Sequence, residues 1–218
     1  MATYKKYDRE KYLTDFSTIM DLRPTVEKYM DEIFQNGVEN LVLAGVGGTM
    51  AIMMPFEAFA KKRTTVPVYL ENAAEVILGT NKAITEKSLV VLYSDSGTTK
   101  ETVALAKYLK YPIVSKAADA YSCDGDFMRL SLIVGAFLKN AGDFPDYDEF
   151  MESLANAPKA MADIKESVEE EVKEYAYSIK DEPYHMLVGS GNLWGSTYCF
   201  AMCYLEEMQW IHTKSITA

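Results

Sequence analysis

Four hydroxyl side chains gather in the segment Ser94-Asp-Ser-Gly-Thr-Thr99, between a predicted strand at residues 89–93 and a predicted helix at residues 100–110. A helix N-terminus offers unpaired N–H groups and a partial positive charge, and both suit a phosphate dianion. Gly97 lets the backbone bend close to a ligand, and the hydroxyl groups add hydrogen-bond donors. We therefore predict a phosphate-binding loop.

The same segment could instead be a helix cap without a ligand, since Thr98 and Glu101 have the spacing of a capping box. A second loop, Gly-Val-Gly-Gly-Thr at residues 45–49, argues for a ligand because it follows another predicted strand at residues 38–45. Ligands of open α/β sheets bind at the carboxyl ends of the strands, where both loops must lie. The second loop lacks the final glycine of a dinucleotide fingerprint, and a P-loop lysine is absent. Two loops at one sheet edge favour a small phosphorylated molecule.

Strands and helices alternate through much of the chain, which indicates an α/β fold with a parallel sheet. Hydrophobic periodicity predicts helices at residues 1–37, 50–62, 72–78, 100–110 and 126–140, and strands at 38–45, 66–70 and 89–93. We expect Pro24 in the first turn of a second N-terminal helix, and Asp126 as a helix N-cap. Residues 149–179 predict a pair of acidic helices broken at Pro158.

A second unit of similar design begins at residue 183. A predicted strand at residues 186–190, a glycine turn and an apolar helix at residues 195–210 repeat the earlier order of strand, turn and helix. One strand and one helix cannot cover both faces of a parallel sheet, so we expect this unit to be incomplete. The first unit is also short, with an expected gap near Val114 and Ser115. We divide the chain into an N-terminal helical segment (1–37), a first α/β domain (38–148), a helical connector (149–182) and the start of a second domain (183–218).

The composition is that of an ordinary globular chain, with 49% hydrophobic and 25% charged residues among 218. The net charge of −10 argues against a nucleic-acid partner, which needs a basic surface. We expect no secretory signal, because residues 1–11 are polar, and no membrane span, because no uncharged apolar run reaches about 18 residues. Cys123, Cys199 and Cys203 give no disulfide framework, and the helical spacing of the last two predicts core residues rather than zinc ligands. A reducing cytoplasm is the expected location.

The two loops and their separation resemble the signature loops of the sugar isomerase (SIS) domain family. The glycine turn after residue 189 and the helix ending in Leu-Glu-Glu-Met-Gln-Trp-Ile at residues 205–211 resemble the second domain of members with two SIS domains. The resemblance implies a flavodoxin-like three-layer sandwich with a parallel sheet, its second SIS domain incomplete here. It also implies that the loops hold a sugar 6-phosphate. The matching loop residues are Gly47, Gly48, Thr49, Ser94, Ser96, Gly97, Thr98 and Thr99.

The pattern around residues 205–211 looks most like that of fructosamine-6-phosphate deglycases, such as the fructoselysine 6-phosphate enzyme. In these enzymes a glutamate near the end of the helix moves protons between sugar carbons, and the matching residue is Glu207. A family histidine that helps ring opening would fall beyond Ala218, and His212 is not at its position. Without the resemblance, Glu206 and Glu207 read as surface residues. The apolar stretch around Glu207 predicts partial burial, which suits a group that exchanges protons.

The resemblance implies an enzyme that hydrolyses a fructosamine 6-phosphate to glucose 6-phosphate and an amine, with no cofactor and no metal. It implies a homodimer or a higher homo-oligomer, with no nucleic-acid or membrane partner. One alternative is an aldose–ketose isomerase of amino-sugar phosphates. Another is a non-catalytic sugar-phosphate sensor, although residues 1–37 are too short for its usual DNA-binding domain. Asp95 could suit an amine on the substrate, and Ser122 and Asp124 are further sugar-binding candidates.

Overall fold

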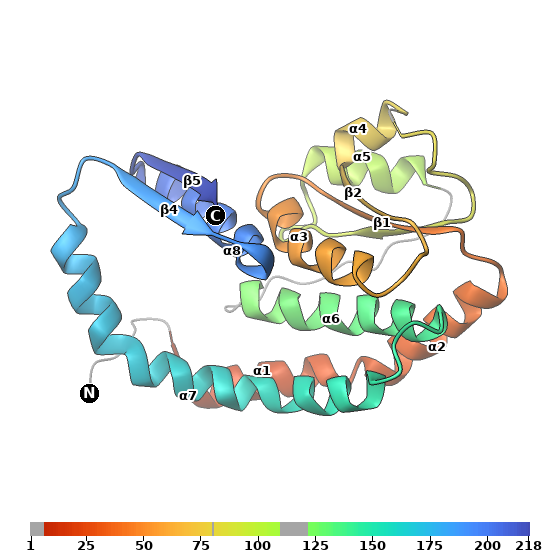
Figure 1. Cartoon of the computed structure of the whole chain (residues 1–218), viewed down its shortest axis with the longest axis horizontal. Coiled ribbons are helices and arrows are strands. Elements are labelled where there is room, and N and C mark those ends of the chain that lie inside the picture. Colours follow the sequence, from red (N-terminus) through yellow and green to blue (C-terminus); the bar gives the residue numbers. More distant parts are fainter. Residues whose placement is uncertain (1–6, 80, 110–121) are drawn as a thin grey trace.

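The computed structural model describes residues 7–79, 81–109 and 122–218 (Figure 1). The expected gap near Val114 and Ser115 and the side chain of Ser122 lie outside the described residues. Within the described ranges, no helix has both the length and the apolar character that a membrane-spanning segment requires.

Strands and helices alternate between residues 40 and 108, as the periodicity predicted. The elements are α1 (Arg9–Met20), α2 (Arg23–Gln35), β1 (Asn40–Gly45), α3 (Gly48–Lys61), β2 (Val68–Asn72), α4 (Ala73–Ile77), β3 (Ser88–Leu92), α5 (Lys100–Tyr108) and α6 (Ser122–Asn140). Pro24 lies at the start of α2, as predicted. The prediction that Asp126 is an N-cap is wrong, because α6 begins one turn earlier and Asp126 is buried within it.

β1 is the centre of a three-stranded parallel sheet with the strand order β2-β1-β3. Every residue of β1 is buried, as expected for a parallel strand with helices on both faces. Ala44 of β1 lies opposite Leu92 of β3, and Gly45 lies opposite Asn72 of β2. The carboxyl ends of β1 and β3 are therefore neighbours, and the two loops that follow them start side by side.

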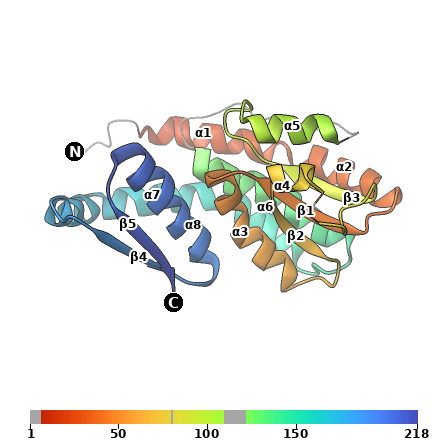
Figure 2. The same cartoon turned by 90° about the horizontal axis from the view of Figure 1, so that it is seen from above.

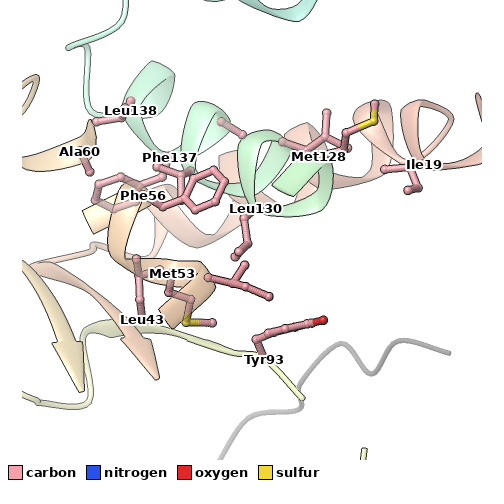
Figure 3. Close-up of a cluster of buried hydrophobic side chains, with 14 of the residues drawn as sticks. Ile19, Leu43, Met53, Phe56, Ala60, Tyr93, Met128, Leu130, Phe137 and Leu138 are labelled. Atoms are coloured by element: carbon pink, nitrogen blue, oxygen red, sulfur yellow. The ribbon is translucent and has the colours of Figure 1, made fainter. Parts of the chain in front are cut away.

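Helices cover both faces of this sheet and make three layers (Figure 2). Leu41 and Leu43 point into the larger core, which includes Phe137 and other side chains of α3 and α6 (Figure 3). Val42 and Ala44 point to the opposite face, where α4 and α5 close a smaller core. This alternation follows from strand geometry. The predicted α/β sandwich with a parallel sheet is confirmed.

The helix α7 (Tyr147–Ile179) is continuous, so the predicted break at Pro158 is wrong. A proline inside a helix removes one backbone hydrogen bond, but tertiary packing can hold such a helix together. Pro158 is buried, so neighbouring side chains pack around the turn of α7 that lacks the hydrogen bond. Figure 1 shows α7 running along α1 and then extending away from the body toward the second unit.

The second unit contains a strand that the sequence patterns did not predict. Its elements are β4 (His185–Gly189), the 3₁₀ helix η1 (Gly191–Leu193), α8 (Trp194–Cys199), the π-helix η2 (Phe200–Glu207) and β5 (Thr213–Thr217). β5 pairs in parallel with β4. The β-branched residues Thr213, Ile216 and Thr217 are the signal that could have revealed it. The apolar helix predicted at residues 195–210 is divided between α8 and η2.

The second unit packs onto α3 through two glycines. A Cβ atom added at Gly195 would lie 2.5 Å from the Ala51 carbonyl oxygen and 2.9 Å from Pro55 Cδ. A Cβ atom added at Gly48, the first residue of α3, would lie 2.8 Å from Cys203 Sγ. Real side chains do not approach this closely, so α8 and η2 reach α3 because these two positions are glycine.

Replacing Gly195 by alanine should therefore push α8 away from α3. We expect Gly195→Ala to lower the free energy of unfolding by about 1–3 kcal/mol, the usual cost of overpacking against a backbone that cannot yield. The midpoint of urea unfolding measures this change. Ser196→Ala is the matched control, because Ser196 is the next residue of the same helix and is exposed. Equal midpoints for the two variants would contradict the proposed glycine contact.

Candidate functional site

The hydroxyl groups of the loop after β3 lie in one cluster. Ser94 Oγ accepts a hydrogen bond from the Gly97 N–H (3.1 Å) and donates to Thr99 Oγ1 (3.3 Å). The hydroxyl oxygens of Ser96 and Thr98 are 2.8 Å apart. Gly97 has a φ of 67°, in the left-handed region that favours glycine. The loop therefore curls at the N-terminus of α5 with its hydroxyl groups gathered together.

Thr99 is the N-cap of α5, and its side chain makes no capping hydrogen bond. The alternative in which Thr98 caps this helix in a capping box is therefore wrong. The first N–H groups of any α-helix have no acceptor within the helix. An anion at this end of α5 would meet those N–H groups and the loop hydroxyls together, which is the arrangement that phosphate binding requires.

Thr49 holds the glycine loop between β1 and α3 in shape. Its Oγ1 accepts from the Val46 N–H (3.0 Å) and donates to the Val46 carbonyl oxygen (2.9 Å). The one proton of this hydroxyl is thus engaged inside the turn. Gly47 is exposed, and a Cβ atom added there would have no atom within 4 Å. Thr49 therefore shapes the turn, while Gly47 leaves the N-terminus of α3 accessible.

Three side-chain contacts join the two loops to α6 and η2 in what we call the contact ring. The Tyr93 hydroxyl, directly before the hydroxyl loop, donates to the Asp126 carboxylate of α6. Cys123 Sγ, in the first turn of α6, lies 2.8 Å from the Tyr204 hydroxyl of η2. Cys203 of η2 lies against the first residue of α3. Because β1 and β3 are paired, these contacts close a ring at the carboxyl edge of the sheet.

The ring brings Glu207 to the same edge as both loops. Glu207 is the last residue of η2, and its carboxylate acts electrostatically on the Cys203 thiol. π-Helices are rare, and they occur frequently at functional sites. The predicted partial burial of Glu207 is wrong, because its side chain is exposed. The apolar side chains expected to bury it, Phe200, Met208 and Trp210, are exposed themselves.

The two adjacent glutamates have different partners. The Glu206 carboxylate accepts a hydrogen bond from the Thr213 hydroxyl of β5. Glu206 also lines a surface hollow of about 420 Å³ between α8, η2 and β5, and a second hollow of about 490 Å³ lies along α7. Neither hollow is lined by a residue of the two loops, so the candidate site rests on the loop geometry. In the described part of the chain, no group of three or more His, Cys, Asp or Glu side chains is placed to hold a metal ion.

The three cysteines converge although Cys123 lies far from Cys199 and Cys203 in the sequence. Cys199 is buried and Cys203 is half-buried, as predicted for small core residues. Burial raises the pKa of Cys199 to about 12, and the neighbouring Cys203 thiol adds to this shift. Burial also raises the pKa of Cys203, although the hydrogen bond between the two thiols lowers this pKa in part. These thiols are therefore protonated at neutral pH and act as packing groups.

Carboxylates surround the start of α6. Burial raises the pKa of the Cys123 thiol, and the charges of Asp126, Asp124 and Asp95 raise it further. The Asp124 carboxylate pairs with Lys165 Nζ of α7 at 3.0 Å. The structure thus engages Asp124 in the contact between α6 and α7, where the sequence suggested a sugar contact. Asp95 lies exposed in the hydroxyl loop itself.

No family model matches the chain. The chain is similar to the fructosamine deglycase FrlB of Bacillus subtilis (strain 168), with 24% identity over 217 residues, covering 88% of this chain and 66% of that protein. It therefore spans just under two thirds of the length of this relative. The predicted resemblance to the fructosamine deglycases is confirmed at this level of similarity.

Two solved structures share the fold of the chain. A Bacillus subtilis protein described as a phosphosugar isomerase matches with a TM-score of 0.79 and 22% identity, over 92% of this chain and 69% of that one. A Salmonella typhimurium protein with the same description matches with a TM-score of 0.82 and 21% identity, over 89% of this chain and 67% of that one. The chain therefore has the fold of the phosphosugar isomerases, as the resemblance implied.

The raised pKa of Cys199 predicts a loss of stability at alkaline pH. An ordinary thiol has a pKa near 8.5, so below this pH both the folded and the unfolded chain hold the proton. Between about 8.5 and 12 only the folded thiol keeps it, and the free energy of unfolding should fall by at most about 1.4 kcal/mol per pH unit. Urea unfolding between pH 8 and 10.5 should therefore show a shallower fall for Cys199→Ala than for the wild type. Parallel curves would show that burial does not shift this thiol.

Proposed function

We propose that this chain binds the phosphate group of a sugar at its two loops and takes part in cleaving a fructosamine 6-phosphate. The observation that carries the proposal is the meeting of the hydroxyl loop and the glycine loop at the carboxyl ends of the paired strands β1 and β3. Two helix N-termini, of α3 and α5, begin there. Both favour an anion, and the hydroxyl cluster supplies donors on the α5 side.

In this proposal the phosphate lies against the N-terminus of α5. The hydroxyl groups of Ser94, Ser96, Thr98 and Thr99 release their mutual hydrogen bonds and donate to the phosphate oxygens. Gly97 allows the loop backbone to follow the ligand. Gly47 and Gly48 border the sugar at the N-terminus of α3, and Thr49 keeps their turn in place.

Glu207 is the proposed proton carrier. A fructosamine loses a proton from C1 and gains one at C2, which converts the ketoamine into an imine between C1 and the amine nitrogen. Water then adds to this imine, and glucose 6-phosphate and the amine separate. One carboxylate on a single face of the sugar can take the first proton and deliver the second. Support comes from the position of Glu207 at the end of η2, at the same edge as the loops.

The similarity to the fructosamine deglycase favours this reaction over an aldose–ketose isomerisation. The isomerase remains the second candidate, because the structural neighbours are described as phosphosugar isomerases. The two reactions share the transfer of a proton from C1 to C2 and differ in the product. The sensor is disfavoured because α1 and α2 contribute Tyr12, Phe16 and Met30 to the main core and form no separate DNA-binding domain in the described residues.

We also propose that the working form is a homodimer. η2 and the segment after it expose several large apolar side chains, and such groups mark surfaces that another chain covers. The exposed side chains are Phe200, Tyr204, Met208 and Trp210.

The proton carrier is tested by comparing Glu207→Gln with Glu206→Gln. We expect Glu207→Gln to slow the release of glucose 6-phosphate from fructoselysine 6-phosphate by about a hundredfold or more, because the amide cannot exchange the proton. Glu206→Gln is the matched control on the same helix, and its rate should stay within about threefold, since Glu206 bonds to β5. A coupled glucose 6-phosphate assay, with separate detection of lysine, measures both. Equal rates in the two variants would refute the role of Glu207, and a rearranged sugar without released lysine would favour the isomerase.

A substitution of Asp95 tests whether the site recognises a charged amine on the substrate. Its carboxylate lies exposed beside the proposed phosphate site, where it suits a substrate that also carries a positive charge. We expect Asp95→Asn to reduce the preference for a lysine adduct over a neutral amine adduct by up to about fivefold, the equivalent of an exposed ion pair of about 1 kcal/mol. Competition between the two adducts measures the preference. An unchanged ratio would show that Asp95 does not contact the amine.

A further inference from the structure

A buried tyrosine and a buried carboxylate meet directly beneath the hydroxyl loop. Tyr93 is the residue before Ser94 and is 8% exposed, and Asp126 of α6 is 1% exposed. The Tyr93 hydroxyl donates to Asp126 Oδ2, and Arg129 Nη1 lies 3.2 Å from Asp126 Oδ1. Figure 3 shows Tyr93 directly after β3, on the side of the sheet that faces α6.

Such a buried carboxylate is costly unless both oxygens have partners. Here Oδ2 accepts a hydrogen bond from the Tyr93 hydroxyl, and Oδ1 accepts one from the Arg129 guanidinium. Burial, followed by the hydrogen bond to Asp126 and its charge, raises the pKa of Tyr93. The phenol therefore stays protonated at neutral pH and can donate its hydrogen bond to Asp126.

Tyr93 is fixed at both its backbone and its side chain. Its N–H donates to the Ala44 carbonyl oxygen of β1 (3.3 Å), and its hydroxyl reaches α6. The hydroxyl cluster beyond it is held by bonds inside the loop, such as those from Ser94 to Thr99 and from Gly97 to Ser94. Those bonds give the loop its shape but do not set its position on the protein. Tyr93, the residue that precedes the loop, links the start of the loop to β1 and α6.

We propose that Asp126 is a positioning residue that, through the Tyr93 hydroxyl, sets the hydroxyl loop at the correct distance from α6 and from the rest of the contact ring. This inference rests on the proposed phosphate site. Asp126 does not touch the sugar. It fixes Tyr93, Tyr93 fixes the start of the loop, and the loop hydroxyls then meet the phosphate in one arrangement. Loss of the hydrogen bond between Tyr93 and Asp126 leaves the loop hydroxyl groups present but displaced. Small displacements of the groups that bind a ligand lower the affinity for it.

The chain contains a second triad of the same chemistry away from the loops. The Tyr147 hydroxyl of α7 donates to Glu27 Oε1 of α2 at 2.7 Å, and Arg23 Nε lies 2.8 Å from the same oxygen. Tyr147 is 3% exposed and belongs to the same core cluster as Tyr93. A tyrosine-to-phenylalanine exchange therefore removes a hydrogen bond from a buried tyrosine to a carboxylate at either place, and only one place adjoins a loop.

The experiment compares Tyr93→Phe with Tyr147→Phe. Calorimetric titration with glucose 6-phosphate gives the affinity, and urea unfolding gives the stability. We expect both variants to lose stability, and Tyr93→Phe to lose more, because Asp126 is buried while the Glu27 side chain is partly exposed to water. Only Tyr93→Phe should weaken glucose 6-phosphate binding, by about tenfold, because only its contact positions the loop. Asp126→Asn keeps an oxygen that can accept a hydrogen bond from the Tyr93 hydroxyl, so the affinity of this variant for glucose 6-phosphate should lie nearer to that of the wild type.

Three results would overturn the inference or its premise, and they can be told apart. Wild-type affinity in Tyr93→Phe would show that the contact is only structural. An equal loss of affinity in both phenylalanine variants would show an effect of general destabilisation. A wild-type protein that binds glucose and glucose 6-phosphate alike would remove the phosphate site, and the proposed function with it.

Discussion

The parallel pairing of β3 with β1 is the constraint on which the candidate site depends. All carboxyl ends of a parallel sheet lie at one edge, so two loops that are distant in the chain begin as neighbours. The register is held by two cores at once, because Leu43 faces the larger core and Val42 the smaller one. A slip by one residue would exchange these faces. The free energy of burying both cores therefore also holds the two loops together.

A second constraint brings Glu207 to that edge. α3 begins at the glycine loop, and α8 and η2 lie against it where Gly48 and Gly195 have no side chains. The backbone of the second unit is thus located by close contact with the helix that starts at the proposed site. The hydrogen bond between the Cys123 thiol and the Tyr204 hydroxyl holds the other side of η2 on α6. The position of Glu207 therefore follows from the packing of η2 against α3 and α6.

The sequence predicted the parts of the structure that depend on local periodicity. The three strands of the first sheet, the helices that cover them and the two loops follow from apolar spacing, glycine and hydroxyl residues, whereas β5 was missed. The sequence did not predict the features that depend on tertiary contacts. Asp126 reads as a helix cap, and only its burial against Tyr93 reveals its role. Pro158 reads as a break, yet packing supports it within α7. The π-helix that ends at Glu207 has no sequence signal that separates it from an α-helix.

The charges at the site explain how a chain with a net charge of −10 could hold a phosphate. Three carboxylates surround the start of α6, and each would repel an anion if its charge were uncompensated. Asp126 is paired with Arg129, and Asp124 with Lys165. Both charges are thereby compensated on the protein side. The groups nearest to the proposed phosphate are then the helix N-termini and the loop hydroxyl groups, while Asp95 and Glu207 are acidic side chains exposed at the same site. The proposed substrate carries both a phosphate and an amine, so its phosphate would meet the helix N-termini and its amine would meet acidic side chains.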